Sequence, residues 1–153
     1  MIAAHFNLGT AYMLTKSYNK AELSFKDCLK LRPNHEPALY NLARVYQNKK
    51  QWINSNEVFK KFIKIKGPNP SVYSQIAWNN LLSGNMGQAN TFYAKVLSYE
   101  PNHIAALINL GKLNYRLGKY EISQSYIKRA LKQDLSQTQL DDLNKLLTNI
   151  STD

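Results

Sequence analysis

The chain has 153 residues, of which 44% are hydrophobic and 20% charged, so its composition is that of a folded domain with a sizeable core and excludes a disordered segment. Its 6 Gly and 5 Pro are too few for a turn-dense β-sandwich or barrel, and no apolar run approaches the roughly 18 residues of a membrane-spanning helix. The net charge is +10, and the single cysteine, Cys28, excludes an intramolecular disulfide and a multi-cysteine metal site.

Two amphipathic helices are predicted within residues 2–35. Apolar and small residues recur there at spacings of three, four and seven, the period that keeps them on one helix face. They are Phe6, Leu8, Gly9 and Tyr12 on the first helix, and Ala21, Phe25, Cys28 and Leu29 on the second. The polar pair Lys16-Ser17 separates the two runs, so the segment is predicted to fold as a helical hairpin.

The pattern of this hairpin returns along the chain at a period of 34 residues. One series of matching triplets is Asn7-Leu8-Gly9, Asn41-Leu42-Ala43, Gln75-Ile76-Ala77 and Asn109-Leu110-Gly111. An independent pair, two periods apart, is Pro33-Asn34-His35 and Pro101-Asn102-His103. Such self-similarity predicts stacked repeats, and the four units are residues 2–35, 36–69, 70–103 and 104–135.

Capping signals mark the third unit and the end of the chain. Asn69 is predicted to be an N-cap, with Pro70 at the first helical position, where its missing N–H costs nothing. After the last unit, Ser136 and Gln139 fit a capping box. The apolar residues that follow at helical spacing are Leu140, Leu143, Leu147 and Ile150. We therefore expect a capping helix over 136–150 that covers the apolar side of the last unit.

This pattern resembles the tetratricopeptide repeat over nearly the whole chain. The matching residues are Leu8, Gly9, Tyr12, Ala21, Phe25 and Pro33 in the first unit, Leu39, Leu42, Ala43, Tyr46 and Phe59 in the second, Tyr73, Ile76, Ala77, Gly84, Ala89, Tyr93 and Pro101 in the third, and Leu107, Leu110, Gly111, Gly118, Tyr120 and Ala130 in the fourth. Asn80 and Asn114 depart from it, because they stand where the family has an aromatic residue. The resemblance implies an all-α, right-handed α-solenoid of four helix-turn-helix repeats plus a C-terminal capping helix, forming a single domain over 1–153.

No residue pattern indicates catalysis, a metal site or a cofactor. His35 and His103 occupy the same loop position two repeats apart, where solvent-exposed histidines are expected. Cys28 has no base predicted beside it and stands where the family usually has Ala, so it is interpreted as a small core residue. Acidic residues are sparse and the glycines form no phosphate loop. We therefore expect a protein that is not an enzyme and that binds no cofactor.

The resemblance also implies a binding surface. In this family the concave groove is lined by fixed positions of each repeat's first helix. The predicted peptide-binding residues are Phe6, Asn7, Tyr40, Asn41, Arg44, Gln75, Trp78, Asn109, Lys112, Tyr115 and Arg116. Aromatic side chains there would supply rigid contact area, and amides would bond a peptide backbone.

One position of this groove carries an amide in every unit: Asn7, Asn41, Gln75 and Asn109. The series resembles the asparagine ladder in the repeat domain of O-linked N-acetylglucosamine transferases, which implies contact with the backbone of an extended peptide. The alternative is that these amides only support helix packing. The Lys and Asn pattern with which co-chaperones of this family grip a C-terminal carboxylate is not matched.

Basic residues follow the repeat as well. Residues 1–69 carry 12 Lys and Arg against 4 Asp and Glu, a net charge of +8. Lys26, Lys30, Lys60 and Lys64 repeat on the second helices, on the expected outer face. They form either a solvated face that keeps the chain soluble or an attachment site for an acidic surface. No aromatic residues are interleaved among them to stack on bases, which disfavours nucleic acid.

The sequence therefore predicts a non-catalytic scaffold that binds a protein or peptide partner in its groove. Two alternatives stay open: a regulatory or substrate-recruiting domain from a larger, glycosyltransferase-like enzyme, and a bacterial envelope or pilus assembly factor. The N-terminus shows no secretory signal, and the compartment is left open. Because no cap precedes the first unit, we expect either a piece of a longer protein or self-association, with Phe6, Met13 and Leu14 near an open edge.

Overall fold

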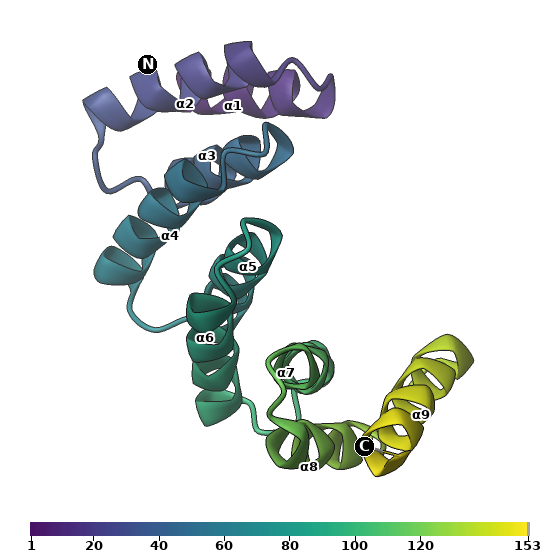
Figure 1. Cartoon of the computed structure of the whole chain (residues 1–153). Helices are drawn as coiled ribbons and strands as arrows, with labels where there is room; N and C mark the ends of the chain where they lie inside the picture. Colours follow the sequence, from purple (N-terminus) through teal and green to yellow (C-terminus); the bar gives the residue numbers. More distant parts are fainter. Residues whose placement is uncertain (153) are drawn as a thin grey trace. The chain divides into compact units, whose positions relative to one another are not determined.

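The computed structural model describes residues 1–152, and Asp153, the last residue of the predicted domain, lies outside the described residues. The described chain forms nine α-helices and no strand, so the predicted all-α helical-repeat fold is confirmed (Figure 1). The helices are α1 (Ile2–Leu14), α2 (Tyr18–Leu31), α3 (Glu36–Asn48), α4 (Trp52–Lys66), α5 (Pro70–Leu82), α6 (Met86–Tyr99), α7 (Ile104–Arg116), α8 (Tyr120–Ala130) and α9 (Gln137–Thr152).

The turns after α1, α3, α5 and α7 have the same backbone geometry. Each contains a residue of positive φ: Lys16 (57°), Lys50 (57°), Gly84 (81°) and Gly118 (70°). In the first turn the Ser17 amide donates to the Tyr12 carbonyl over 2.8 Å, and the Lys16 amide donates to the Met13 carbonyl over 3.1 Å. These two bonds are those of a Schellman motif, which satisfies the last carbonyls of a helix. The repeat of 34 residues is therefore a repeat of turn geometry as well as of side chains.

Three first helices begin at side-chain caps. Asn69 Oδ1 accepts a hydrogen bond from the Val72 amide at 3.0 Å, with Pro70 as the first residue of α5, as the sequence predicts. His35 Nδ1 accepts from the Ala38 amide at 3.2 Å, and His103 Nδ1 accepts from the Ala106 amide at 3.1 Å. The expectation of solvent-exposed loop histidines is wrong on this point, because both side chains are half-buried and cap α3 and α7.

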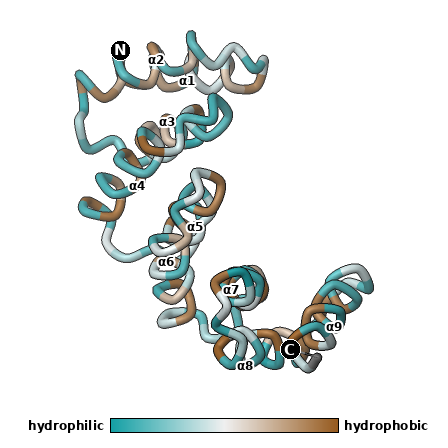
Figure 2. Tube along the Cα trace, in the orientation of Figure 1, coloured by the Kyte–Doolittle hydropathy of each residue, from teal (hydrophilic) through white to brown (hydrophobic). Residues whose placement is uncertain are grey.

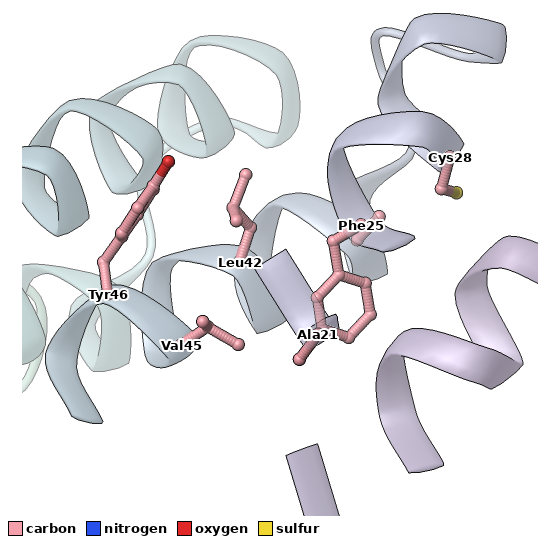
Figure 3. Close-up of a cluster of buried hydrophobic side chains, with 7 residues drawn as sticks. Ala21, Phe25, Cys28, Leu42, Val45 and Tyr46 are labelled. Atoms are coloured by element: carbon pink, nitrogen blue, oxygen red, sulfur yellow. The ribbon is translucent and has the colours of Figure 1, made fainter. Parts of the chain in front are cut away.

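The chain divides into two compact parts, each larger than a single repeat. From here on, the first unit denotes Met1–Val72, and the second unit denotes the part that begins at Tyr73. The core of the first unit lies between α2 and α3, which α1 also contacts. Figure 3 shows Phe25 and Ala21 of α2 close to Leu42 and Val45 of α3. Cys28 is fully buried in the same cluster. A single domain over 1–153 stays a prediction.

Close packing within a repeat depends on small residues of the first helix. A Cβ added to Gly9 would lie 2.7 Å from the Phe25 ring, and one added to Gly111 would lie 2.8 Å from Ile127 Cγ1. Atoms do not approach so closely without a shift of the neighbouring side chain. These glycines therefore let α1 approach α2 and let α7 approach α8.

In the second unit, α9 packs against α7 and α8. Leu143 of α9 is fully buried in a cluster with Leu107 and Ile108 of α7 and Ile127 and Ala130 of α8. The predicted capping box is present, because the Ser136 amide donates to Gln139 Oε1 at 2.9 Å and the Gln139 amide donates to Ser136 Oγ at 3.3 Å. Hydrophobic and hydrophilic stretches alternate along α9 (Figure 2), as expected of a helix that buries one face.

The two asparagines that depart from the family pattern are buried and hydrogen-bonded. Asn80 Nδ2 donates to the Ile76 carbonyl at 2.9 Å. Asn114 Nδ2 lies 2.8 Å from the Leu110 carbonyl and 3.0 Å from Asn90 Oδ1, to both of which it donates. The bond to Asn90 joins α7 to α6, so a polar contact replaces the aromatic packing that the family pattern leads one to expect.

Candidate functional site

In the first unit, the predicted groove residues come from α1 and α3. Phe6 is half-buried, and its ring centroid lies 6.0 Å from that of Phe25 and 5.2 Å from that of His35. Tyr40 is also half-buried, with its ring 5.8 Å from Phe59. Both aromatic rings are therefore held in place by packing inside the repeats and expose only part of their surface.

The polar members of this set are more accessible. Asn7 on α1 and Arg44 on α3 are exposed, and Asn41 on α3 is half-buried. Asn7 and Asn41 lie in the first unit, whereas Gln75 and Asn109 lie in the second. Each unit thus carries two of the four predicted amides, and the continuous ladder stays a prediction.

In the second unit, Trp78 of α5 is 44% exposed. That is an unusual position for the largest apolar side chain, which proteins bury more often than not. On the same helix Gln75 is half-buried and already engaged in an interaction of its own. Asn109 of α7 is half-buried as well. Trp78 is therefore the accessible aromatic of α5.

Three predicted residues of α7 converge on a pocket of about 370 Å³ between α7 and α9. They are Lys112, Tyr115 and Arg116, and α9 supplies the opposite wall. The full lining is Lys112, Tyr115, Arg116, Asp142, Lys145, Leu146 and Asn149. Because ligand sites in proteins are concave and mix apolar walls with a few polar groups, this pocket is the best-defined part of the candidate site.

Helical spacing explains why these side chains meet. Lys112, Tyr115 and Arg116 are separated by three and four positions, so they share one face of α7. On α9 the four lining residues, from Asp142 to Asn149, have spacings of three, four and seven, the same period as the buried stripe that contains Leu143. Burial of Leu143 turns this neighbouring stripe towards α7. These α9 residues are absent from the predicted site because the sequence predicts α9 only as a capping helix, not as a wall of the groove.

The charges of the pocket are partly paired. Lys112 Nζ lies 3.2 Å from Asp142 Oδ2, and both side chains remain substantially exposed. Arg116 and Lys145 also line the pocket, and neither forms an ion pair with any residue in the described part of the chain. The Tyr115 ring lies 5.5 Å from the Tyr120 ring. The pocket therefore combines an apolar wall with an excess of positive charge.

Several of the basic residues of the second helices are paired with carboxylates. Lys26 Nζ lies 2.6 Å from Glu22 Oε1, and Lys30 Nζ lies 2.8 Å from Asp27 Oδ1. Lys60 and Lys64 of α4 are exposed. These ion pairs neutralise part of the positive charge of α2 within the chain, which favours the interpretation of a solvated face.

Cys28 carries the one thiol of the chain. Burial raises the pKa of the Cys28 thiol although the charge of Arg32 opposes the shift, so the nucleophilic thiolate is disfavoured. Within residues 1–152 no group of three or more His, Cys, Asp or Glu side chains is arranged to hold a metal ion. None of the described helices combines the length and the apolar character needed to span a bilayer.

Comparison with known protein sequences identifies the repeats. Residues 2–35 and residues 104–137 each match a sequence model of the tetratricopeptide repeat. Lipopolysaccharide assembly protein B of Escherichia coli strain K12 is 24% identical over 132 residues, which cover 83% of this chain and 34% of that protein. The chain therefore spans about a third of the length of this curated relative.

Solved structures share the fold. A tetratricopeptide repeat protein from Parabacteroides merdae superimposes with a TM-score of 0.90 at 16% identity, covering 99% of this chain and 60% of that one. MamA from Desulfovibrio magneticus RS-1 gives 0.77 at 20% identity, covering 86% and 75%. YrrB, described as a TPR protein with an unusual peptide-binding site, gives 0.79 at 14% identity, covering 97% and 75%.

Proteins built from such repeats generally serve as non-catalytic scaffolds whose stacked helices present extended binding surfaces. The repeat matches at both ends of the chain, the nine helices of its described part and the likeness to solved tetratricopeptide repeat structures agree. Residues 2–35 and 104–137 are tetratricopeptide repeats, and the described part of the chain has the fold of tetratricopeptide repeat proteins.

Proposed function

We propose that this chain is a protein-interaction module that holds an extended or helical segment of a partner protein against the first helices of its repeats. The observation that carries the proposal is the pocket between α7 and α9, which gathers Lys112, Tyr115 and Arg116. The peptide-binding site named for the structurally similar YrrB supports this class of partner.

Two kinds of side chain would divide the work of binding. Tyr40, Trp78 and Tyr115 offer aromatic area whose loss of conformational freedom is small, because packing already restrains Tyr40 and Tyr115. The amides of Asn41 and Asn109 would hydrogen-bond the backbone of the segment whatever its sequence. Aromatic anchors dominate binding energy at protein interfaces, so Trp78 and Tyr115 should matter more than either amide.

The test is to capture a partner with the intact protein, map the bound segment with synthetic peptides, and measure the affinity of that peptide for variants. Each lost amide contact should cost about 0.5–1.5 kcal/mol. The double variant Asn41→Ala, Asn109→Ala should therefore bind about tenfold more weakly, while its circular dichroism spectrum stays helical. Trp78→Ala or Tyr115→Ala should each weaken binding further than a single amide change.

Charge reversal on the second helices is the matched control. Lys60→Glu with Lys64→Glu changes two exposed residues of the second helix α4. Unchanged affinity is expected. If the reversal abolishes binding and the asparagine pair has no effect, the recognition surface is the basic face of the second helices, and the first-helix proposal is wrong.

Bacterial envelope assembly is a second candidate setting for this scaffold. The observation that favours it is the match to lipopolysaccharide assembly protein B, over about a third of that protein. In this case, deletion of the gene from its host should alter the lipopolysaccharide content of the envelope, and the wild-type gene should restore it. Unchanged lipopolysaccharide after deletion would remove this candidate without affecting the peptide-binding proposal.

Self-association through the first repeat is a further part of the proposal. Leu8 of α1 is 46% exposed, whereas Leu42 at the corresponding position of the second repeat is 4% exposed. Leu14 is 79% exposed as expected, but Phe6 and Met13 are half-buried against the core of the first unit. The apolar edge is therefore formed by Leu8 and Leu14, and a second copy or another segment could cover it.

A further inference from the structure

The chemistry of the pocket between α7 and α9 narrows the class of its occupant. We propose that this pocket binds an acidic side chain together with an adjacent apolar side chain of an extended partner segment. The inference rests on the proposed function, because it takes α7 to be part of the surface that holds the partner. The charge balance of the pocket and its apolar wall are the observations that specify the acidic and apolar character of the bound segment.

The charge of the pocket is positive on balance. Lys112, Arg116 and Lys145 line it together with one carboxylate, Asp142. The Lys112–Asp142 pair, at 3.2 Å, neutralises itself. Neither Arg116 nor Lys145 takes part in an ion pair among residues 1–152. Two positive charges, one from each wall, are thus available to an occupant of negative charge.

A carboxylate suits this arrangement of donors. The guanidinium of Arg116 can donate two parallel hydrogen bonds to a carboxylate, and the ammonium of Lys145 adds a second cation from the facing helix. The Lys112–Asp142 pair is a weak competitor, since its side chains are 43% and 56% exposed and stay hydrated. Lys112 could therefore exchange Asp142 for the carboxylate of a bound segment.

The remaining lining residues favour an apolar group in the ligand. The Tyr115 ring is held by its contact with the Tyr120 ring at 5.5 Å, and Leu146 is packed against the core of the second unit. The volume of about 370 Å³ is near the lower end of the roughly 300–1,000 Å³ typical of ligand pockets. It suits a few side chains, and an acidic residue next to a leucine or aromatic residue would satisfy both walls.

Extended polyanions fit this pocket less well. A nucleic acid is held by cations that track its backbone and by aromatic rings on which its bases stack, whereas Tyr115 is the one aromatic residue lining this pocket and Asp142 repels phosphates. A membrane surface would contact protruding cations and not a hollow between two helices. The pocket therefore favours an acidic peptide segment.

The test uses the full chain and three labelled synthetic peptides of one design, in which leucine alternates with Glu, with Gln or with Lys. Affinity is measured by fluorescence anisotropy, and binding is located by amide chemical shifts of α7 and α9. We expect the Glu peptide to bind at least about tenfold more tightly than the Gln peptide, with shifts at Tyr115 and Leu146. Arg116→Gln with Lys145→Gln should remove that preference.

Two further variants separate recognition from net charge. Lys128→Gln with Lys132→Gln removes the same charge from exposed residues outside the pocket and should keep the preference for the Glu peptide. Asp142→Asn removes the internal competitor and should tighten binding of the Glu peptide several-fold, a gain that damage to the fold would not produce. The inference is overturned if the Lys128, Lys132 variant loses as much affinity for the Glu peptide as the Arg116, Lys145 variant does. It is also overturned if Asp142→Asn weakens binding of the Glu peptide.

Failure of this inference differs from failure of the proposed function. If the Gln or Lys peptide binds α7 as tightly as the Glu peptide, the surface binds peptides and the acidic assignment is wrong. If none of the three shifts α7 or α9, the pocket is not a peptide site and both proposals fail there. Vesicles of phosphatidylglycerol and phosphatidylcholine are the remaining arm: binding that depends on Arg116 and Lys145, with no peptide bound, would assign the pocket to a lipid headgroup instead.

Discussion

Glu22 of α2 accepts a hydrogen bond from Lys49, the residue that follows α3, with Oε2 and Nζ 2.6 Å apart, and so joins the first repeat to the second. Its other oxygen, Oε1, accepts from Lys26 at 2.6 Å and from the Tyr46 hydroxyl at 3.2 Å. One carboxylate thus connects three side chains across a repeat boundary. Networks of this kind are sensitive to the protonation of their central acceptor.

Acid should weaken this connection. Burial raises the pKa of Glu22, but hydrogen bonds from Lys26 and Lys49 outweigh it and hold the pKa below its usual value. A carboxyl group whose folded pKa lies below its unfolded pKa, about 4.3, stabilises the fold above that pH and loses this contribution as the pH falls. Glu22→Gln should therefore lower the free energy of unfolding at neutral pH and change it little near pH 3.

Urea unfolding at the two pH values measures this difference. Glu57→Gln, which changes an exposed carboxylate of α4, is the matched control and should have a small effect at both. Equal destabilisation by Glu22→Gln at neutral and acid pH would show that the side chain acts through packing and not through its charge.

Alkaline pH should destabilise the fold through Tyr93 in the second unit. Burial raises the pKa of Tyr93 to about 12, above the value near 10 of an unfolded tyrosine. Because the folded state resists ionisation, the contribution of Tyr93 is complete below pH of about 10 and is lost as the pH rises towards 12. In Tyr93→Phe, the free energy of unfolding should fall less over this pH range than in wild type. The control Tyr120→Phe, at an exposed tyrosine, should show the same fall as wild type. The same fall in wild type and Tyr93→Phe would contradict the assignment.

The turns offer a stabilising change. Lys50 and Gly84 occupy the same turn position of successive repeats, with φ values of 57° and 81°. A residue with a Cβ pays about 1–2 kcal/mol in this region, partly offset by the greater freedom of glycine in the unfolded chain. Lys50→Gly should therefore stabilise the protein by about 1 kcal/mol, and Gly84→Ala should destabilise it by a similar amount.

Thermal unfolding provides the measurement, with Lys61→Gly as the control. Lys61 is an exposed lysine inside α4, where glycine costs about 1 kcal/mol. A lower melting temperature for Lys50→Gly, like that of the control, would mean that the turn does not depend on a positive φ.

The helices and their turns could be predicted from the sequence because each depends on local chemistry. The turn at Lys50 contains no glycine, yet the 34-residue period places it at the position that Gly84 and Gly118 occupy in later repeats. The period carried the information that the local residues lacked. The capping box at Ser136 was likewise a local pattern, and its two hydrogen bonds are present.

The pocket could be predicted only in half. Lys112, Tyr115 and Arg116 were named because they occupy repeat positions, but α9 is not a repeat and its register on α7 is a tertiary contact. The spacing of Asp142 and Lys145 alone does not indicate which helix these side chains face. The capping role of His35 was missed for a related reason, since histidine is a rare N-cap and its identity points first to solvent or catalysis.

The exposed edge of the first repeat predicts unequal effects for two equivalent leucines. Leu42 is 4% exposed and Leu8 is 46% exposed. Leu42→Ala should cost about 2–5 kcal/mol of stability, whereas Leu8→Ala should cost little and should reduce self-association. Urea unfolding and sedimentation velocity measure the two effects. A monomer at high concentration whose sedimentation Leu8→Ala leaves unchanged would remove the self-association proposal.

The capping helix is tested most sharply at one side chain. Leu143 is fully buried among residues of α7 and α8, whereas its neighbour Asn144 is exposed on the same helix. Leu143→Ala should lower the free energy of unfolding by about 2–5 kcal/mol, since it leaves a cavity where three helices meet. Asn144→Ala should stay within about 0.5 kcal/mol of wild type. Removal of residues 136–153 should go further, exposing Leu107 and Ile127 and promoting aggregation. If Leu143→Ala is no more harmful than Asn144→Ala and the truncated chain stays monomeric, α9 does not complete the core, and the wall that it gives to the pocket would be an incidental contact.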